Sequence, residues 1–295
     1  MQPESHQLEL APNIFSAVHR FKTKNSRIPV LLIHGSMESS RIFYSYSGKG
    51  FAPYLAKNGF DVFAVDLAGK GQSTPHANRD LKHSQSDFIH RDMNIYLKHL
   101  QKIYPTTPIR MGAHSWGGVL ALAWYSFYGN LNNTGPMVFF GTKRRIGVFH
   151  PKRIFMVDLM WSGLGYFSGA LLGYVPTGKL KLGIDDEPLQ FFKETNHWVY
   201  SKKWIDHQTG KDISKLLRSK EKPPILHFAG VKDTVLGNPL DVERLMKETG
   251  GENTEMVLLG KANSNLKDYG HNDMLTAKEA PDDHFRQAVD WLLKD

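Results

Sequence analysis

Ser115 stands in the run MGAHSWGG (111–118), between a short apolar stretch and a helical pattern. The small residues Ala113 and Gly117 lie two positions before and two after it, so a strand and a helix can approach each other closely around this turn. A serine at the start of a helix is commonly an N-cap. The same turn can instead lift the hydroxyl out of the fold, where it could attack a substrate as a nucleophile.

Two more side chains decide between these interpretations. Asp233 lies just beyond the apolar run PILHFAG (224–230), and His271 follows the run TEMVLLG (254–260) and a loop. His271 would take the proton of the serine hydroxyl, and Asp233 would hold the imidazole in one tautomer and stabilise its charged form. We therefore predict that Ser115, His271 and Asp233 are nucleophile, base and acid.

The order serine, acid, histidine resembles that of the α/β-hydrolase family, and the resemblance covers nearly the whole chain. A strand that ends in His-Gly, within LLIHGSM (31–37), resembles the family's oxyanion loop. The resemblance implies that the backbone N–H groups of Ser36 and Trp116 bind the oxyanion that forms during acyl transfer. Met37 is the alternative to Ser36, because the sequence does not fix the register of the loop.

Three further features bear on this resemblance. Ala113 stands where the family most often has glycine, and a methyl group should be tolerated there. The run DLAGKGQS (66–73) resembles the family's Asp-x-x-Gly-x-Gly-x-Ser turn, whose glycines serve tight turns. The run GYVPTGKLKLG (173–183) and the residues after it resemble a functionally undefined subgroup of bacterial predicted hydrolases, which supports the fold but names no substrate.

Other acids and histidines fit the predicted roles less well. Asp241 falls inside a helical pattern, Asp273 follows the predicted base too closely to face its ring, and Asp66 ends an earlier strand. His34 and His114 do not lie where the base belongs in the chain order. We expect both histidines to be structural.

Alternating strand and helix patterns must position these residues. Two N-terminal stretches alternate like an antiparallel pair, and a helical pattern over 86–104 has Ser86 as its candidate N-cap. Continuous apolar runs predict strands buried on both faces at 28–35, 61–69, 109–113, 136–141, 224–230 and 254–260. This pattern predicts an α/β fold, with a central mostly parallel sheet of about eight strands and helices on both faces. Ligands bind such sheets at the carboxyl ends of the strands, where the candidate residues stand.

One insertion interrupts the alternation. Residues 143–222 show no buried-strand pattern, and a structureless loop of that length is improbable in a compact domain. We predict a helical cap there, on a hydrolase core formed by residues 1–142 and 223–295.

The stretch 154–175 within this cap carries one charge, Asp158, and is long enough to span a bilayer. The strands on either side belong to one sheet, which argues against a span. Its glycines and serines predict a break into two short helices that line an acyl pocket. Peripheral contact with membranes stays open, with a basic cluster facing anionic headgroups. That cluster consists of Lys143, Arg144, Arg145, Lys152 and Arg153.

Composition and motifs exclude several other classes of protein and site. The net charge of +8 is scattered among acids and no nucleic-acid-binding motif is present, so we expect no nucleic-acid partner. The absence of cysteine excludes disulfides, thiolate catalysis and cysteine metal sites. No metalloprotease, P-loop or dinucleotide fingerprint occurs, which predicts no cofactor and no metal. The first fifteen residues lack the features of a secretion signal and predict a cytoplasmic protein.

Together these features predict a serine hydrolase that cleaves a carboxylic ester with a hydrophobic or lipid-like part through an acyl-enzyme. An aminopeptidase or amidase is the second hypothesis, since acids in the cap could bind a substrate ammonium. These acids are Asp185, Asp186, Glu187 and Glu194. A binding protein that kept the fold and lost turnover is the third. The sequence leaves the oligomeric state unknown.

Overall fold

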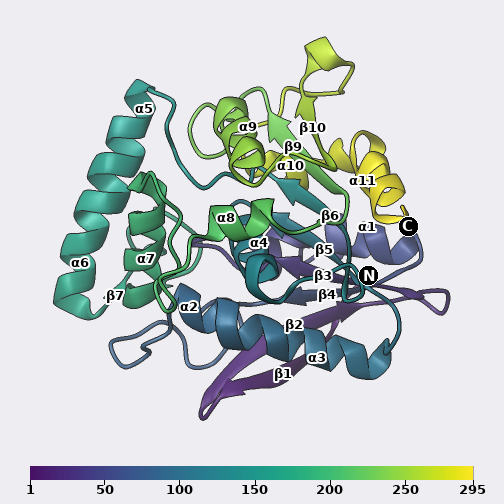
Figure 1. The fold of residues 1–295 in the computed structure, drawn as a ribbon, viewed down its shortest axis with the longest axis horizontal. Coiled ribbons are helices and arrows are strands. Elements are labelled where there is room, and N and C mark those ends of the chain that lie inside the picture. Colours follow the sequence, from purple (N-terminus) through teal and green to yellow (C-terminus); the bar gives the residue numbers. More distant parts are fainter. Residues whose placement is uncertain (295) are drawn as a thin grey trace.

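An eight-stranded sheet forms the centre of the molecule in the computed structural model, which describes residues 1–294 (Figure 1). Its strands pair in the order β1-β2-β4-β3-β5-β6-β9-β10. Their bounds are β1 Glu4–Ala11, β2 Ile14–Phe21, β3 Ile28–Ile33, β4 Phe60–Val65, β5 Ile109–His114, β6 Thr134–Phe140, β9 Ile225–Gly230 and β10 Thr254–Leu259. Strands β1 and β2 run antiparallel to their neighbours, and all other pairs are parallel. The predicted mostly parallel eight-stranded sheet is confirmed.

Helices cover both faces of this sheet, which is why β4, β6 and β9 are buried along their whole length. One face packs against α3 and α4, and the other against α1 and α11. These helices and α9, which joins β9 to β10, have the bounds α1 Phe51–Lys57, α3 Met93–Ile103, α4 Trp116–Tyr128, α9 Pro239–Glu248 and α11 Phe285–Leu292. The parallel strands end at one edge, so the loops that follow β3, β5, β6, β9 and β10 meet there.

The helical pattern over 86–104 begins earlier than predicted. Ser84, not Ser86, is the N-cap: its Oγ accepts from the N–H of Asp87, and the Asp87 carboxylate accepts from the N–H of Ser84. The helical stretch then runs through α2 (Gln85–Asp87), a π-helical turn and α3. The prediction missed this reciprocal pair because it considered the serine alone.

The segment between β6 and β9 holds α5 to α8, and α10 (Asp273–Thr276) lies after β10. Two very short strands, β7 (Tyr174–Val175) and β8 (Glu187–Pro188), pair with each other, and α7 (Leu189–Tyr200) and α8 (Ile213–Arg218) follow. Before them, α5 (Pro151–Arg153), a π-helical stretch (Ile154–Leu164) and α6 (Gly165–Leu172) form one continuous helix, here called the outer helix. Figure 1 shows it at the periphery of the molecule, with α7 on its inner side.

The predicted break of this helix into two was wrong. Gly165 and Gly169 face α7, where a Cβ would come within 2.7 Å of the Phe192 ring and 2.6 Å of Leu189. These glycines therefore permit close helix packing instead of interrupting the helix, which ends at Gly173 with φ of 81°. Within residues 1–294 the outer helix is the one helix long and apolar enough to cross a membrane, and 28% of its most apolar window is buried inside the protein.

Candidate active site

Ser115 sits in a strained turn between β5 and α4. Its backbone has φ of 50° and ψ of −119°, a combination that residues other than glycine rarely adopt. Gly117 makes this turn feasible, because a Cβ there would collide with the carbonyl oxygen of Ile33 in the neighbouring strand. Ala113 is fully buried in the core, so its methyl group is accommodated. Such an observed outlier at a strand end indicates a functional residue.

His271 and Asp233 meet beside this turn. Nδ1 of His271 donates to Oδ2 of Asp233 at 2.5 Å, and Oδ1 of Asp233 accepts from the N–H of Gly237 at 2.8 Å. The carboxylate is buried, and its two hydrogen bonds fix the orientation of the imidazole. With Nδ1 protonated and bonded, Nε2 is the nitrogen left to act as a base.

The other acids considered from the sequence bind elsewhere. Asp66 bonds with His19 and accepts from the N–H groups of Ser40 and Gln72, so it holds its own turn together. Asp241 accepts from the N–H groups of Gly147 and Val148 and from Arg244. Asp273 accepts from the N–H of Gly270 and pairs with Lys267. Among the acids of residues 1–294, Asp233 is the one bonded to the His271 ring.

Charge and burial set the ionisation of the pair. Burial raises the pKa of Asp233, but the facing His271, the Gly237 N–H and the charge of Lys143 outweigh it and hold the pKa below its usual value. For His271, burial lowers the pKa and outweighs the opposing effect of Asp233, and His114 and Lys143 add to the lowering. The imidazole is therefore neutral near pH 7, the form that accepts a proton.

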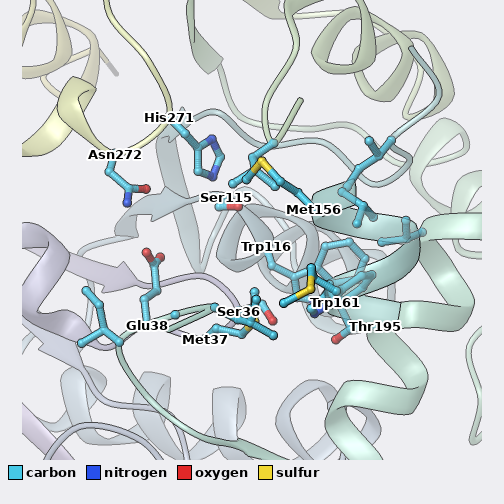
Figure 2. Close-up of a pocket in the computed structure, with 18 of the residues that line it drawn as sticks. Ser36, Met37, Glu38, Ser115, Trp116, Met156, Trp161, Thr195, His271 and Asn272 are labelled. Carbon is cyan, nitrogen blue, oxygen red and sulfur yellow. The ribbon is translucent and has the colours of Figure 1, made fainter. Parts of the chain in front are cut away.

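Ser115 and His271 line one cavity, and Figure 2 shows the histidine ring directed toward the serine. The Ser115 hydroxyl accepts a hydrogen bond from Nζ of Lys143 at 3.3 Å. It forms none with His271 among the hydrogen bonds of residues 1–294. Catalytic hydrogen bonds often tighten only when substrate is bound, so this arrangement is compatible with a nucleophile and its base.

Ser36 and Trp116, whose N–H groups are the predicted oxyanion donors, line the same cavity as Ser115. Trp116 is the first residue of α4, and the first N–H groups of a helix have no partner within the helix. The N–H of Ser36 donates no hydrogen bond within residues 1–294, whereas that of Met37 donates to Oε2 of Glu187 at 2.8 Å. The two candidates for the oxyanion loop thus differ: Ser36 has a free donor and Met37 does not.

Glu187, which comes from β8, holds this loop from the opposite side. Its Oε2 accepts from the Ser36 hydroxyl at 2.9 Å, and its Oε1 accepts from the Lys70 ammonium at 2.6 Å. Both members of the Glu187–Lys70 ion pair are fully buried. The Ser36 loop is therefore held by a residue about 150 positions away in the chain. This contact positions the loop and with it the free N–H of Ser36.

A second carboxylate and histidine lie behind the first pair. Oε1 of Glu38 accepts from the N–H of Gly35 and lies 2.7 Å from Nδ1 of His114, while Nε2 of His114 lies 3.2 Å from the backbone carbonyl of His271. Both ring nitrogens of His114 thus lie within hydrogen-bond distance of an oxygen atom. This arrangement positions the backbone of His271, a structural role of the kind expected for His114. His34 bonds with the carbonyl of Gly35 and the N–H of Leu67, as expected of a structural histidine.

The cavity around these groups measures about 430 Å³ and is mostly apolar. The outer helix, the loop before β8 and α7 supply most of its wall, including Met156, Trp161, Leu182 and Val199. Figure 2 shows Met156 and Trp161 next to Ser115 and Trp116. Lys143 is the buried cation of this lining, and the exposed Lys181 lies at its rim.

Two residues of the predicted basic cluster do not face solvent. Lys143 and Arg144 are buried, and Arg144 bonds with Glu248 and with the carbonyl oxygens at the end of α7. In a run of basic residues directly after a buried strand, the sequence alone does not indicate which side chains are buried. The sequence did not indicate the roles of Glu38, Lys70 and Glu187 for a related reason, because Ser36 and Lys70 lie far from Glu187 in the chain, and His114 lies far from Glu38.

No three side chains of the metal-binding types are grouped to hold an ion within the part of the chain that the structure describes. Three aromatic residues of the insertion, Trp198, Tyr200 and Trp204, do not line the cavity. Trp198 and Trp204 are buried in the core, and Tyr200 bonds with Ser162 and Asp158.

Comparison with known proteins establishes the fold. A family model described as alpha/beta hydrolase fold matches residues 28–134, which include the predicted oxyanion loop and the serine turn. The predicted resemblance to that family is thereby confirmed for this part of the chain. No curated protein matches the sequence.

Solved structures extend the likeness over the whole chain. A soluble variant of monoglyceride lipase from Saccharomyces cerevisiae, in complex with a substrate analog, has a TM-score of 0.67 at 17% identity and covers 99% of this chain and 94% of its own. A bromoperoxidase from Bacillus anthracis has a TM-score of 0.65 at 18% identity, covering 99% and 100%. A putative aryl esterase from Burkholderia cenocepacia has a TM-score of 0.61 at 15% identity, covering 97% of each chain. At such identities the comparisons show the α/β-hydrolase fold alone.

Proposed function

We propose that this chain, which has the α/β-hydrolase fold, is a serine hydrolase that cleaves a carboxylic ester with a hydrophobic or lipid-like part. One observation carries the proposal: Ser115, in its strained turn, shares an apolar cavity with an imidazole that Asp233 holds at 2.5 Å. A turn that needs only small residues has no reason to place a serine with positive φ beside a buried histidine–carboxylate pair.

In the first half of the reaction, Oγ of Ser115 attacks the ester carbonyl carbon while Nε2 of His271 takes the hydroxyl proton. The N–H groups of Ser36 and Trp116 bind the negative carbonyl oxygen of the tetrahedral intermediate. The bond between the carbonyl carbon and the alcohol oxygen then breaks, and His271 gives its proton to the departing alcohol. An acyl group remains on Ser115.

In the second half, water replaces the alcohol. His271 takes a proton from water, the resulting hydroxide attacks the acyl carbon, and the same two N–H groups bind the oxyanion again. The bond to Oγ breaks, His271 returns the proton to Ser115, and the carboxylic acid leaves. Asp233 stabilises the imidazolium in both halves without becoming protonated.

Lys143 adds a positive charge that the sequence did not suggest. Its ammonium is buried, lies 3.3 Å from Oγ, and would stabilise negative charge on this oxygen as the proton leaves. In a cavity with few other charges, such an interaction is stronger than in water.

The substrate class follows from the wall of the cavity. Most lining side chains are aliphatic, aromatic or methionine, which favours an acyl or alcohol part without charge. We propose that residues 143–222 act as the cap that forms this wall. The similar folds of a monoglyceride lipase and a putative aryl esterase agree with an ester substrate.

An aminopeptidase is less favoured by the same geometry. Its substrate ammonium needs a free carboxylate, but Glu187 is paired with Lys70, and Glu194 accepts from two backbone N–H groups of α2. Neither carboxylate lines the cavity, whereas Lys143 and Lys181 do. Glu38 also lines the cavity, but its carboxylate accepts from the N–H of Gly35 and bonds with His114. Glu38 is therefore not a free carboxylate for a substrate ammonium.

Labelling with a fluorophosphonate probe tests the proposed nucleophile. The unsubstituted chain should be labelled, whereas Ser115→Ala should not be, and His271→Ala should react far more slowly. Asn272→Ala serves as the control at the cavity rim. An ester panel graded by acyl length should then show turnover that falls to background in Ser115→Ala. Labelling that persists in Ser115→Ala would contradict the proposal, and a folded protein that neither labels nor turns over any ester would support a binding protein instead.

A further inference from the structure

The outer helix presents an apolar surface that nothing within residues 1–294 covers. Ten of the twenty large hydrophobic side chains exposed in the described chain belong to residues 149–184. Five of those on the helix are at least half exposed: Ile154, Phe155, Leu159, Phe167 and Leu171. Monomeric proteins rarely leave so many large apolar groups together in water, so a contiguous patch of this kind marks an interaction site.

The opposite face of the helix is packed against the protein. Val157 and Trp161 are buried, and the Trp161 ring meets Phe192 of α7 edge to face at 5.3 Å. Gly165 and Gly169 continue this buried line with their close approach to α7. A helix that packs against protein along one side cannot be surrounded by lipid, so the outer helix does not cross a bilayer. Its apolar face is instead an exposed surface of the protein.

Positive charge borders the apolar face at both ends. Exposed Lys152 lies at the start of the helix, and exposed Arg79 donates to two carbonyl oxygens of its last turn. Lys82 lies next to Arg79, and Lys179 and Lys181 are exposed in the loop that follows the helix. A protein partner with an apolar groove would not require this basic border, whereas an anionic lipid surface attracts it.

The apolar face is continuous with the cavity. Phe155 and Met156 are exposed on the helix and also line the cavity that holds Ser115, and Ile184 and Lys181 complete the same rim. A molecule that leaves a lipid surface in contact with this helix would therefore meet the cavity without crossing water.

We propose that the outer helix docks on an anionic lipid surface, lying in the plane of the headgroups with Leu159, Phe167 and Leu171 inserted. Lys152, Lys179 and Lys82 contact the headgroups around them. The charges steer the approach, and the apolar side chains supply most of the affinity. Docking is a property of the surface and does not depend on the proposed function. The further idea that the docked lipid supplies the ester substrate does rest on the proposed function.

Vesicle co-sedimentation with the full-length chain tests this. Two kinds of vesicle are compared. One contains phosphatidylcholine with about 30 mol% phosphatidylglycerol, which gives a strongly negative surface, and the other contains phosphatidylcholine alone. The unsubstituted chain should bind the anionic vesicles, and binding should weaken as salt rises. Leu159→Ser/Phe167→Ser/Leu171→Ser should lower the affinity on the order of a hundredfold. Lys82→Gln/Lys152→Gln/Lys179→Gln should lower it about fivefold for each lost charge.

Three exposed leucines outside the outer helix provide the matched control. Leu240→Ser/Leu266→Ser/Leu293→Ser removes a similar apolar area and should leave vesicle binding unchanged. Neither triple serine variant touches the cavity, so each should hydrolyse a water-soluble short-chain ester like the unsubstituted chain. This readout keeps the two proposals separate, because vesicle binding without esterase activity would contradict only the proposed function.

Three results would overturn the docking proposal. One is binding to neither kind of vesicle. Another is a dimer in light scattering that the outer-helix variant converts to a monomer while vesicle binding is absent, because the apolar face would then cover a second copy of this chain. Equal loss of binding in the control triple variant would likewise show that the outer helix has no special part.

Discussion

Nζ of Lys143 lies 3.3 Å from Oγ of Ser115, and this hydroxyl is the hydrogen-bond partner of a buried ammonium that forms no ion pair within residues 1–294. Removing a cation from water without a counter-ion is costly. The cost of burying the Lys143 ammonium is explained if negative charge forms beside it during the reaction. The Ser115 oxygen carries such a charge as it attacks the substrate. Asp233 and Glu38 are close enough to influence the ammonium but are each bonded to a histidine.

Replacing this lysine should therefore affect chemistry more than binding. We expect Lys143→Met to lower kcat for an uncharged ester about 100-fold, the lower end of the range found when one donor to a developing charge is removed. KM should change little, because the ammonium makes no contact that a neutral ground state needs. Lys181→Met, at the rim of the same cavity, is the control and should retain kcat. A raised KM with unchanged kcat in Lys143→Met would show that the lysine binds substrate instead.

The pH profile should have two limits. His271 must be neutral to accept a proton, and burial lowers its pKa below 6.5, so activity should rise with pH through a point below 6.5 and be complete by pH 7. Lys143 must be charged to act on Ser115, and burial lowers its pKa to about 8, so activity should fall again as pH rises through about 8. Measuring kcat/KM from about pH 4 to about pH 10 checks both limits.

The alkaline limit can be assigned to a residue. In Lys143→Met the remaining activity should no longer decline near pH 8, whereas the acid limit should stay. An alkaline decline that persists in this variant would have to come from another group, and the proposed role of the ammonium would be wrong.

Glu187 should matter for both stability and rate. Glu187→Leu leaves the buried ammonium of Lys70 without its partner and should destabilise the fold by ~3–5 kcal/mol, measured by urea unfolding. In Lys70→Met/Glu187→Leu both charges are gone, so most of that stability should return. The proposed oxyanion loop would still lack its acceptor for Ser36 and Met37, so kcat should remain low in the double variant. Full recovery of kcat together with stability would show that Glu187 is only structural.

Local pattern and chain order were enough to predict the sheet and to single out residues at its strand ends. Parallel strands buried on both faces have continuous apolar sequences, and Asp233 follows such a strand, β9. His271 follows β10, which was predicted to be buried on both faces but is an edge strand and mostly half-buried. The residues that were missed depend on contacts with no local sign. Glu187 reaches Ser36 across 151 positions, and the glycine line of the outer helix has its explanation in Phe192, on a different helix. A glycine alone predicts a break, and only its neighbour in space shows that it permits close packing.

The two small residues around Ser115 should differ in what they tolerate. In Gly117→Ala the new methyl group would collide with the carbonyl oxygen of Ile33, which is backbone and cannot move aside, so we expect destabilisation of about 1–3 kcal/mol and loss of activity as the serine turn shifts. Ala113→Gly removes a methyl group from a buried strand position and should cost only about 1 kcal/mol while activity is kept. Thermal unfolding and ester turnover measured on both variants check this difference. If Gly117→Ala were as stable and active as Ala113→Gly, close approach of strand and helix could not be what shapes the turn.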